Sequence, residues 1–294
     1  MQSEKTSGVD IEQLLQSNEF YEKVRSDIGR KILFEVQLHD PMQIDYVCND
    51  DDFSLILKHI ENVWMQLGAT EPHWSVVSTA DFKATKIREN IDRFNESGRA
   101  EVNNLKRLLK RVGVDASHVR TAVEYGCGVG RVTRWLATLF PNVIGIDVSE
   151  SHLGLAREYF SQEGVGNVIT KKISSLDEIK SLPTYEFLYS KIVLQHNPPP
   201  VIHKILDTLS AQLAEGGIGV VQIPTYARNY RFSVAEYINS MGKISNMEMH
   251  VLPQPAIFDI FRKHGCIPRE VSRDHLVRTV DFVSTTFVFV KNSV

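Results

Sequence analysis

The feature that most constrains the fold of this 294-residue chain is a glycine-rich turn, Glu124-Tyr-Gly126-Cys-Gly128-Val-Gly130. A short apolar run over residues 121–127 leads into it, and apolar residues then recur at helical spacing over 132–140. Glycines between a strand and a helix let the backbone bend tightly and bring its amides close to a ligand. The turn therefore predicts a ligand site at the carboxyl end of a strand in an α/β fold.

The spacing of the glycines favours a cationic ligand over a pyrophosphate. A dinucleotide fingerprint needs a glycine three positions after Gly128, where this chain has Arg131. Glu124 stands two positions before the first glycine, and its charge would repel a pyrophosphate but suits an ammonium group. S-adenosylmethionine carries both an ammonium and a sulfonium, so it is the predicted cofactor.

Strand and helix patterns alternate after residue 120. Apolar strand patterns follow at 142–148, 168–173, 185–194 and 218–223, with helical patterns between them. This alternation predicts a doubly wound, mostly parallel sheet with helices on both faces. The last two strand patterns, 266–272 and 282–290, have no helix between them, so we expect an antiparallel C-terminal hairpin and seven strands in all.

The N-terminal part reads as a helical cap. Apolar residues recur at helical spacing over 11–32, over 52–67 with Gly68 as the stop, and over 102–112 with Gly113 as the stop. Residues 72–98 are predicted to form a loop. We therefore divide the chain into a helical cap or lid, 1–100, and a catalytic domain, 101–294, with a substrate-side insertion at 225–253.

An acidic residue at the end of the second predicted strand supports the cofactor assignment. Asp147 lies 21 positions beyond Gly126, where a carboxylate can accept hydrogen bonds from both ribose hydroxyls of an adenosine. Many doubly wound proteins place an aspartate there only to cap a helix, and that alternative stays open for Asp147 taken alone. In combination with the glycine turn, the position favours an adenosine ligand.

On these motifs, over about residues 100–294, the chain resembles the class I S-adenosylmethionine-dependent methyltransferases, a Rossmann-like family. The resemblance implies that the glycine turn wraps the methionine moiety and that Asp147 holds the ribose. It implies a contact between adenine and His152, and a backbone contact after the third strand, where the family often has an acid. The residues expected to bind the cofactor are Glu124, Gly126, Cys127, Gly128, Arg131, Asp147, Val148, His152, Ser175, Leu176 and Ser190.

The loop after the fourth predicted strand contains the candidate catalytic residue, His196. Sugar O-methyltransferases of natural-product pathways look similar here and use a histidine in this loop as general base. Hydroxyl methylation needs such a base, because the nucleophile loses its proton as it attacks the methyl group. A histidine that only holds the loop in place is the alternative. The string Asn197-Pro198-Pro199 resembles the motif of adenine-N6 and glutamine methyltransferases, but Pro200 replaces the aromatic residue of that motif.

Acceptor binding is assigned to the insertion, where Tyr226 and Tyr230 flank Arg228. Such aromatic and cationic side chains suit a sugar face or an anionic group, although a lid packed on its own core is an equal alternative. We expect a small-molecule or carbohydrate acceptor, as in polysaccharide biosynthesis. The open alternatives are methylation of a small amine and a non-catalytic module that binds the cofactor.

Composition narrows the partners and the compartment. The 33 basic and 36 acidic residues leave a net charge of −3, which disfavours nucleic acid. The chain has no apolar stretch of membrane-spanning length, and no signal-peptide core follows Met1. Three widely spaced cysteines indicate reduced thiols, and we expect a cytoplasmic protein without a membrane partner. No carboxylates cluster near His250 or His275, so no metal is expected, and a homodimer is left open.

Overall fold

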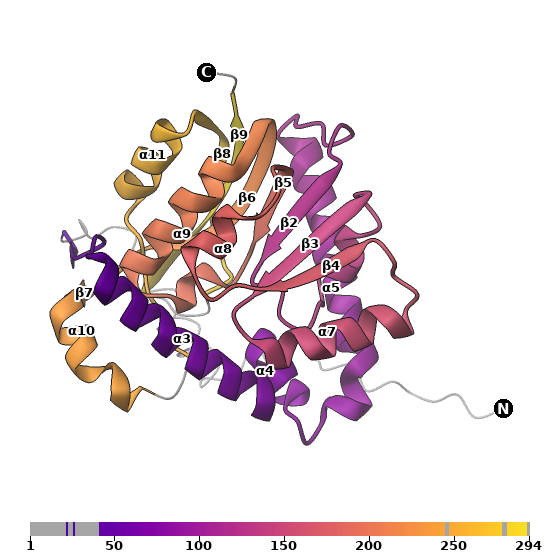
Figure 1. Cartoon of the computed structure of the whole chain (residues 1–294), viewed down its shortest axis with the longest axis horizontal. Coiled ribbons are helices and arrows are strands. Elements are labelled where there is room, and N and C mark those ends of the chain that lie inside the picture. Colours follow the sequence, from indigo (N-terminus) through magenta and orange to yellow (C-terminus); the bar gives the residue numbers. More distant parts are fainter. Residues whose placement is uncertain (1–21, 23–25, 27–40, 245–246, 278–280, 293–294) are drawn as a thin grey trace.

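The computed structural model describes Glu22, Ser26 and residues 41–244, 247–277 and 281–292 (Figure 1). The helix predicted over residues 11–32 lies, apart from Glu22 and Ser26, outside these residues. No helix in the described part of the chain is both long and apolar enough to cross a membrane.

A seven-stranded sheet forms the centre of the molecule, with the order β4-β3-β2-β5-β6-β9-β8. Strands β2 to β6 are parallel, and β9 runs antiparallel to both β6 and β8. The predicted seven strands and C-terminal hairpin are confirmed. The strands are β2 Thr121–Tyr125, β3 Asn142–Asp147, β4 Val168–Lys172, β5 Tyr185–Ser190, β6 Leu213–Ala227, β8 Cys266–Asp274 and β9 Phe282–Lys291.

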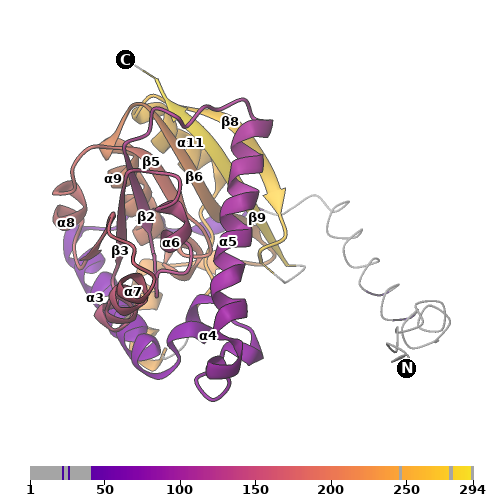
Figure 2. The same ribbon diagram turned by 90° about the vertical axis from the view of Figure 1, so that its right-hand side faces the viewer.

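Helices cover both faces of the sheet, because neighbouring residues of a strand point to opposite sides. Ala122 and Phe187 belong to one core with α5 (Ile87–Arg111) and α6 (Thr133–Leu136). Val123 and Leu188 belong to the other core, with α8 (Leu176–Lys180), α9 (Pro199–Gln212) and α11 (Gln254–Lys263). Figure 2 shows α5 on one side of the sheet and α8 on the other. Helix α7 (Glu150–Gln162) connects β3 to β4.

The cap is more helical than its glycines and prolines predict. Gly68 lies inside α3 (Asp50–Thr70) instead of ending it, and α4 (Pro72–Val76) follows directly. A Cβ at Gly68 would lie 2.5 Å from Ser149 Oγ and 2.8 Å from His152 Nδ1. The glycine thus lets α3 approach α7, so the prediction of a helix stop was wrong.

The loop predicted over residues 72–98 is also wrong. It contains α4 and the short 3-10 helix η1 (Ala80–Phe82), and α5 already begins at Ile87. Gly98, at the end of the predicted loop, lies inside α5, where a Cβ would be 2.0 Å from the backbone oxygen of Arg131. The domain boundary predicted at residue 100 falls inside this helix, which packs on the sheet.

Two helical glycines provide a test of this packing argument. Gly98→Ala should destabilise the protein by about 2–3 kcal/mol, because the new methyl group overlaps a backbone carbonyl that has little room to move. Gly154→Ala in α7 is the matched control: nothing lies within 4 Å of the added Cβ, and alanine should stabilise that helix by about 0.5–1 kcal/mol. Denaturant unfolding of both variants measures the difference, and a neutral Gly98→Ala would contradict the close approach.

The predicted insertion is tied to the N-terminal segment. Residues 225–227 continue β6, which is longer than the predicted strand. Strand β7 (Arg231–Phe232) pairs in parallel with β1 (Gln43–Ile44), and α10 (Val234–Ser240) and the 3-10 helix η3 (Met241–Lys243) follow. Chain segments about 190 residues apart therefore form one small sheet beside the main one.

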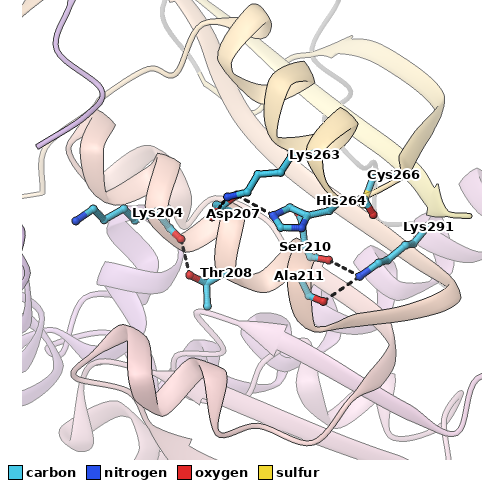
Figure 3. Close-up of polar contacts among 9 residues, drawn as sticks. All are labelled: Lys204, Asp207, Thr208, Ser210, Ala211, Lys263, His264, Cys266 and Lys291. Carbon is cyan, nitrogen blue, oxygen red and sulfur yellow. Dashed lines mark hydrogen bonds and ion pairs between the residues drawn. The ribbon is translucent and has the colours of Figure 1, made fainter. Parts of the chain in front are cut away.

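A polar cluster fastens α9 to α11 and to the end of β9 (Figure 3). Asp207 accepts hydrogen bonds from Lys263 Nζ at 2.8 Å and pairs with His264 Nε2 at 2.8 Å. Lys291 Nζ donates to the carbonyls of Ser210 and Ala211 at 3.2 and 2.9 Å, near the carboxyl end of α9. A cation there satisfies carbonyls that the helix leaves open.

The Asp207 contacts predict an acid-sensitive contribution to stability. Burial alone raises the pKa of Asp207, but the hydrogen bonds from Lys263 and His264 outweigh it and lower the pKa overall. A lowered folded-state pKa stabilises the protein above the unfolded-state pKa, and the contribution is lost as the pH falls through the folded value. Asp207→Asn should therefore cost about 1 kcal/mol near pH 7 and much less near pH 3, as measured by urea unfolding. An equal cost at both pH values would contradict this linkage.

Candidate functional site

A cavity lies at the carboxyl ends of β2, β3 and β5, and we name it the carboxyl-end cavity. Ligands of open α/β sheets bind at this edge. Its wall combines the glycine turn, the ends of the strands and two cap helices. The lining residues are Ile60, Trp64, Ser75, Val76, Glu101, Glu124, Tyr125, Gly126, Cys127, Gly128, Arg131, Val132, Asp147, Val148, His152, Lys191, Ile192, Val193 and Asn197.

The glycine turn has the backbone shape that only glycine adopts readily. Gly126, Gly128 and Gly130 have φ values of +78°, +54° and +80°. The amides of Gly126 and Cys127 both donate to the carbonyl of Ile146, at 2.8 and 3.0 Å. These bonds hold the turn against the end of β3, next to Asp147.

The Asp147 carboxylate joins the turn to the start of α7. Its Oδ2 accepts from the Gly128 amide at 2.8 Å, and its Oδ1 accepts from the Ser149 amide at 2.9 Å. Each carboxylate oxygen has two lone pairs, so both retain room for a further donor. Asp147 is thus oriented by the backbone and still lines the carboxyl-end cavity.

Glu124 is a buried acid at the base of the cavity. Its side chain accepts a hydrogen bond from Thr133 Oγ1 at 2.6 Å. Burial raises the pKa of Glu124 to about 8, with that hydrogen bond acting in the opposite direction. The carboxyl group therefore holds a proton at neutral pH, and a cation bound beside it would favour its ionised form.

Glu101 of α5 forms a buried charge cluster that sequence reasoning missed. Arg131 Nη2 lies 2.8 Å from its carboxylate, Tyr189 Oη donates to it at 2.7 Å, and Lys191 Nζ lies 3.8 Å away. Burial raises the pKa of Glu101, but the charges of Arg131 and Lys191 outweigh it, and the pKa is lowered overall. No motif in the helical pattern of residues 102–112 marks this acid.

Two buried nitrogen atoms of the wall have no hydrogen-bond partner in the described structure, Arg131 Nε and His152 Nδ1. The other ring nitrogen of His152 bonds Ser75 Oγ at 2.9 Å. An unpaired buried donor or acceptor is costly, so such atoms suggest a missing ligand. The wall thus offers carboxyl groups, a cation, and unpaired nitrogens of an imidazole and a guanidinium. These groups fit a ligand that has ammonium, carboxylate, hydroxyl and adenine groups, as S-adenosylmethionine has.

The cap contributes a wall that the sequence did not reveal. Ile60 and Trp64 of α3 and Ser75 and Val76 of α4 line the carboxyl-end cavity. The Trp64 ring centroid lies 6.2 Å from that of His152 and 5.5 Å from that of His196. Trp64 falls within the apolar helical pattern of residues 52–67, and nothing in that pattern marks it as a cavity residue.

His196 lies beside the cavity, against Trp64, and is not one of its lining residues. Its Nδ1 lies 2.7 Å from the backbone oxygen of Glu248. Because a carbonyl only accepts, Nδ1 carries the proton and Nε2 is the unprotonated nitrogen, 3.2 Å from Gln195 Nε2. Burial lowers the pKa of His196 to about 4.

The structure brings together eight of the predicted residues in the cavity wall. They are Glu124, Gly126, Cys127, Gly128, Arg131, Asp147, Val148 and His152. The side chain of Ser190 donates to the carbonyl of Tyr125 at 3.0 Å, and Ser175 caps α8 next to Leu176. Neither serine nor Leu176 is among the lining residues.

The predicted acceptor residues also lie outside the cavity wall. Tyr226 is part of β6, and the exposed Arg228 lies 3.7 Å from the Asp281 carboxylate. The hydroxyl of Tyr230 forms a 2.6 Å hydrogen bond with His250 Nδ1. Within the described ranges, no three His, Cys, Asp or Glu side chains gather as a metal ion requires, and Cys48, Cys127 and Cys266 are free thiols.

Residues 122–217 match the family model described as a methyltransferase domain, and this segment holds the glycine turn and Asp147. The chain contains a class I methyltransferase domain. The methyltransferase depends on S-adenosylmethionine as its methyl donor.

Curated relatives of the methyltransferase include both O- and N-methyltransferases. The ubiquinone biosynthesis O-methyltransferase of Dechloromonas aromatica is 27% identical over 190 residues, which are 56% of this chain and 79% of the relative. The N-terminal Xaa-Pro-Lys N-methyltransferase 1 of Xenopus tropicalis is 30% identical over 122 residues, 40% of this chain and 53% of the relative. The chain thus spans about half the length of the second relative.

Solved structures share the fold of the methyltransferase. The crystal structure of magnesium protoporphyrin IX methyltransferase from Synechocystis with bound SAM has a TM-score of 0.52 at 15% identity. The match covers 79% of this chain and 97% of that chain. The Rossmann-like methyltransferase fold of the sheet is confirmed.

Proposed function

We propose that the methyltransferase transfers the methyl group of S-adenosylmethionine to a hydroxyl group of a small molecule, with sugars and glycans among the candidate acceptors. The observation that carries this proposal is the tautomer of His196. Its Nδ1–H donates to the Glu248 carbonyl, so Nε2 holds the lone pair that can take a proton; the Gln195 side-chain amide, 3.2 Å away, donates to it and would have to give way to the acceptor hydroxyl. A hydroxyl acceptor needs such a base as it attacks the methyl group.

The wall of the carboxyl-end cavity supplies the groups that would hold the cofactor. Asp147 would accept hydrogen bonds from the ribose hydroxyls, and Glu124 would face the ammonium group. The glycine turn would wrap the methionine moiety. When bound, the cofactor supplies a methyl group activated by a sulfonium. The role of the protein is then to align the acceptor with that group and to exclude water beneath the cap, through Ile60 and Trp64.

Methylation of a small amine is the second candidate, and one observation favours it. Burial lowers the pKa of His196 to about 4, so the imidazole is a weak base. A neutral amine needs no base to attack the methyl group. The two curated relatives divide in the same way, one named as an O-methyltransferase and the other as an N-methyltransferase.

Methyl transfer from isotopically labelled cofactor distinguishes the two candidates. The full-length protein would be incubated with sugars, glycans, phenols and small amines, and mass spectrometry of each product would locate the label. We expect the label on an oxygen atom. Label found only on amine nitrogen would overturn the hydroxyl proposal and support the second candidate.

A further inference from the structure

The cavity wall around Trp64 is uncharged and partly aromatic. Ile60 lies four residues earlier on the same face of α3, and Val193 packs in the same apolar cluster as both residues. Two imidazoles lie near the indole, those of His152 and His196. Burial lowers the pKa of both histidines, so these neighbours are neutral near pH 7.

The charged part of the same cavity is unsuited to an additional anion. Among the described lining residues, the two cations are Arg131 and Lys191, and both pair with the single carboxylate of Glu101. Glu124 is protonated at neutral pH, so the ionised groups of the described wall are Glu101 and Asp147 against Arg131 and Lys191, and their charges balance. A phosphorylated or nucleotide-linked acceptor would therefore find no excess positive charge to offset its own negative charge.

The indole lines the cavity and lies near the proposed base. Its ring centroid is 6.2 Å from that of His152, the residue expected to contact adenine, and 5.5 Å from that of His196, the proposed base. An aromatic ring or the apolar face of a sugar packs favourably on indole, and such contacts give orientation as well as affinity. Trp64 is a side chain of a packed helix, α3, so its backbone is well positioned for that role.

We propose that Trp64 is a specificity-determining residue, the surface on which an uncharged ring that carries the acceptor hydroxyl stacks beside His196. This inference rests on the proposed hydroxyl methylation and narrows its substrate class. It selects neutral aromatic or sugar rings and excludes sugar phosphates and nucleotide sugars.

Binding to the full-length protein saturated with S-adenosylhomocysteine tests the inference without catalysis. The probes are catechol as a neutral aromatic ring, methyl α-glucopyranoside as a neutral sugar ring, and glucose 1-phosphate as an anionic sugar. At least one neutral ring should bind saturably, and Trp64→Ala should weaken that binding about tenfold, whereas Trp64→Phe should keep it within about threefold. Trp74→Ala is the matched control, because Trp74 lies in the cap on α4 but not in the cavity wall.

Fluorescence gives a second measurement that leaves Trp64 in place. The chain has three tryptophans, so Trp74→Phe combined with Trp135→Phe leaves Trp64 as the single indole emitter. The bound neutral ring should change its emission saturably, with the dissociation constant found by calorimetry. The inference is overturned if neither neutral ring binds, if binding is unchanged in Trp64→Ala, or if glucose 1-phosphate binds more tightly than both.

Failure of this inference differs from failure of the proposed function. In one outcome, ring binding requires Trp64 but the transfer assay labels only amines. That outcome would refute hydroxyl methylation and still support Trp64 as the stacking surface. Methylation of a ring hydroxyl that is indifferent to Trp64→Ala would refute the stacking surface alone.

Discussion

Asp147→Ala should weaken the binding of S-adenosylhomocysteine about 100-fold. The substitution removes the expected acceptor of two ribose hydroxyl bonds, and hydrogen bonds to a charged group contribute about 1.5–3 kcal/mol each. It also removes the bonds from the amides of Gly128 and Ser149, which hold the glycine turn against the start of α7. Isothermal titration calorimetry of the purified variant measures the loss.

Asp147→Asn separates ligand contact from turn geometry. Asparagine keeps one oxygen acceptor and the size of the side chain but loses the charge, so we expect a smaller loss, about tenfold. The thermal unfolding midpoint of each variant without ligand reports whether the turn is still folded. An unchanged affinity in Asp147→Ala would refute the ribose assignment, whatever the unfolding midpoint.

The part of the cavity wall that contains Glu124 and Asp147 could be predicted, because these residues lie at the ends of strands. Parallel strands bring their carboxyl ends to one edge, so Glu124 and Asp147 had to lie close together once β2 and β3 were recognised as neighbours. Their register bears this out, since Glu124 pairs with Gly145 and Tyr125 with Ile146. Short local patterns sufficed, and the eight predicted wall residues come from this part of the chain.

The cap wall could not be predicted, because it depends on contacts between segments far apart in the sequence. The sequence predicts a helix stop at Gly68 and a loop at Gly98, but each is a point where a helix approaches another part of the chain closely. A glycine that allows close packing looks the same in sequence as one that ends a helix. Trp64 and Glu101 enter the cavity only because α3 and α5 are brought in by such contacts.

The role of the insertion could not be predicted from the sequence either, because it also depends on contacts between distant segments. Aromatic and basic residues near Tyr230 suggested an acceptor site, but the hydroxyl of Tyr230 bonds a buried histidine, His250. Composition alone does not distinguish an aromatic that faces a ligand from one that packs in a lid. Tyr230 precedes β7, which pairs with β1 about 190 residues earlier in the chain, and no local pattern predicts that pairing.

His196→Ala should lower methyl transfer to a hydroxyl acceptor about 100-fold, with little change in cofactor affinity. A positioned base contributes about 10²–10⁴-fold to such a reaction, and a low pKa places His196 at the lower end of that range. Its position outside the cavity wall explains why cofactor binding should persist. His203→Ala on α9 is the matched control, because the ring of that histidine lies 5.6 Å from that of Tyr46 and His203 is not a lining residue.

The pH dependence of kcat/KM tests the role of His196 independently of how much activity His196→Ala loses. The neutral imidazole is the active form, so the rate should be constant above the pKa of His196, about 4, and fall as the pH drops through it. The acid limb should disappear in His196→Ala, since no imidazole remains to be protonated. His196→Gln, which retains a hydrogen-bonding side chain, should resemble His196→Ala if the residue is a base. Near-normal turnover in His196→Gln would instead assign His196 to holding the loop against Glu248 and would favour an amine acceptor.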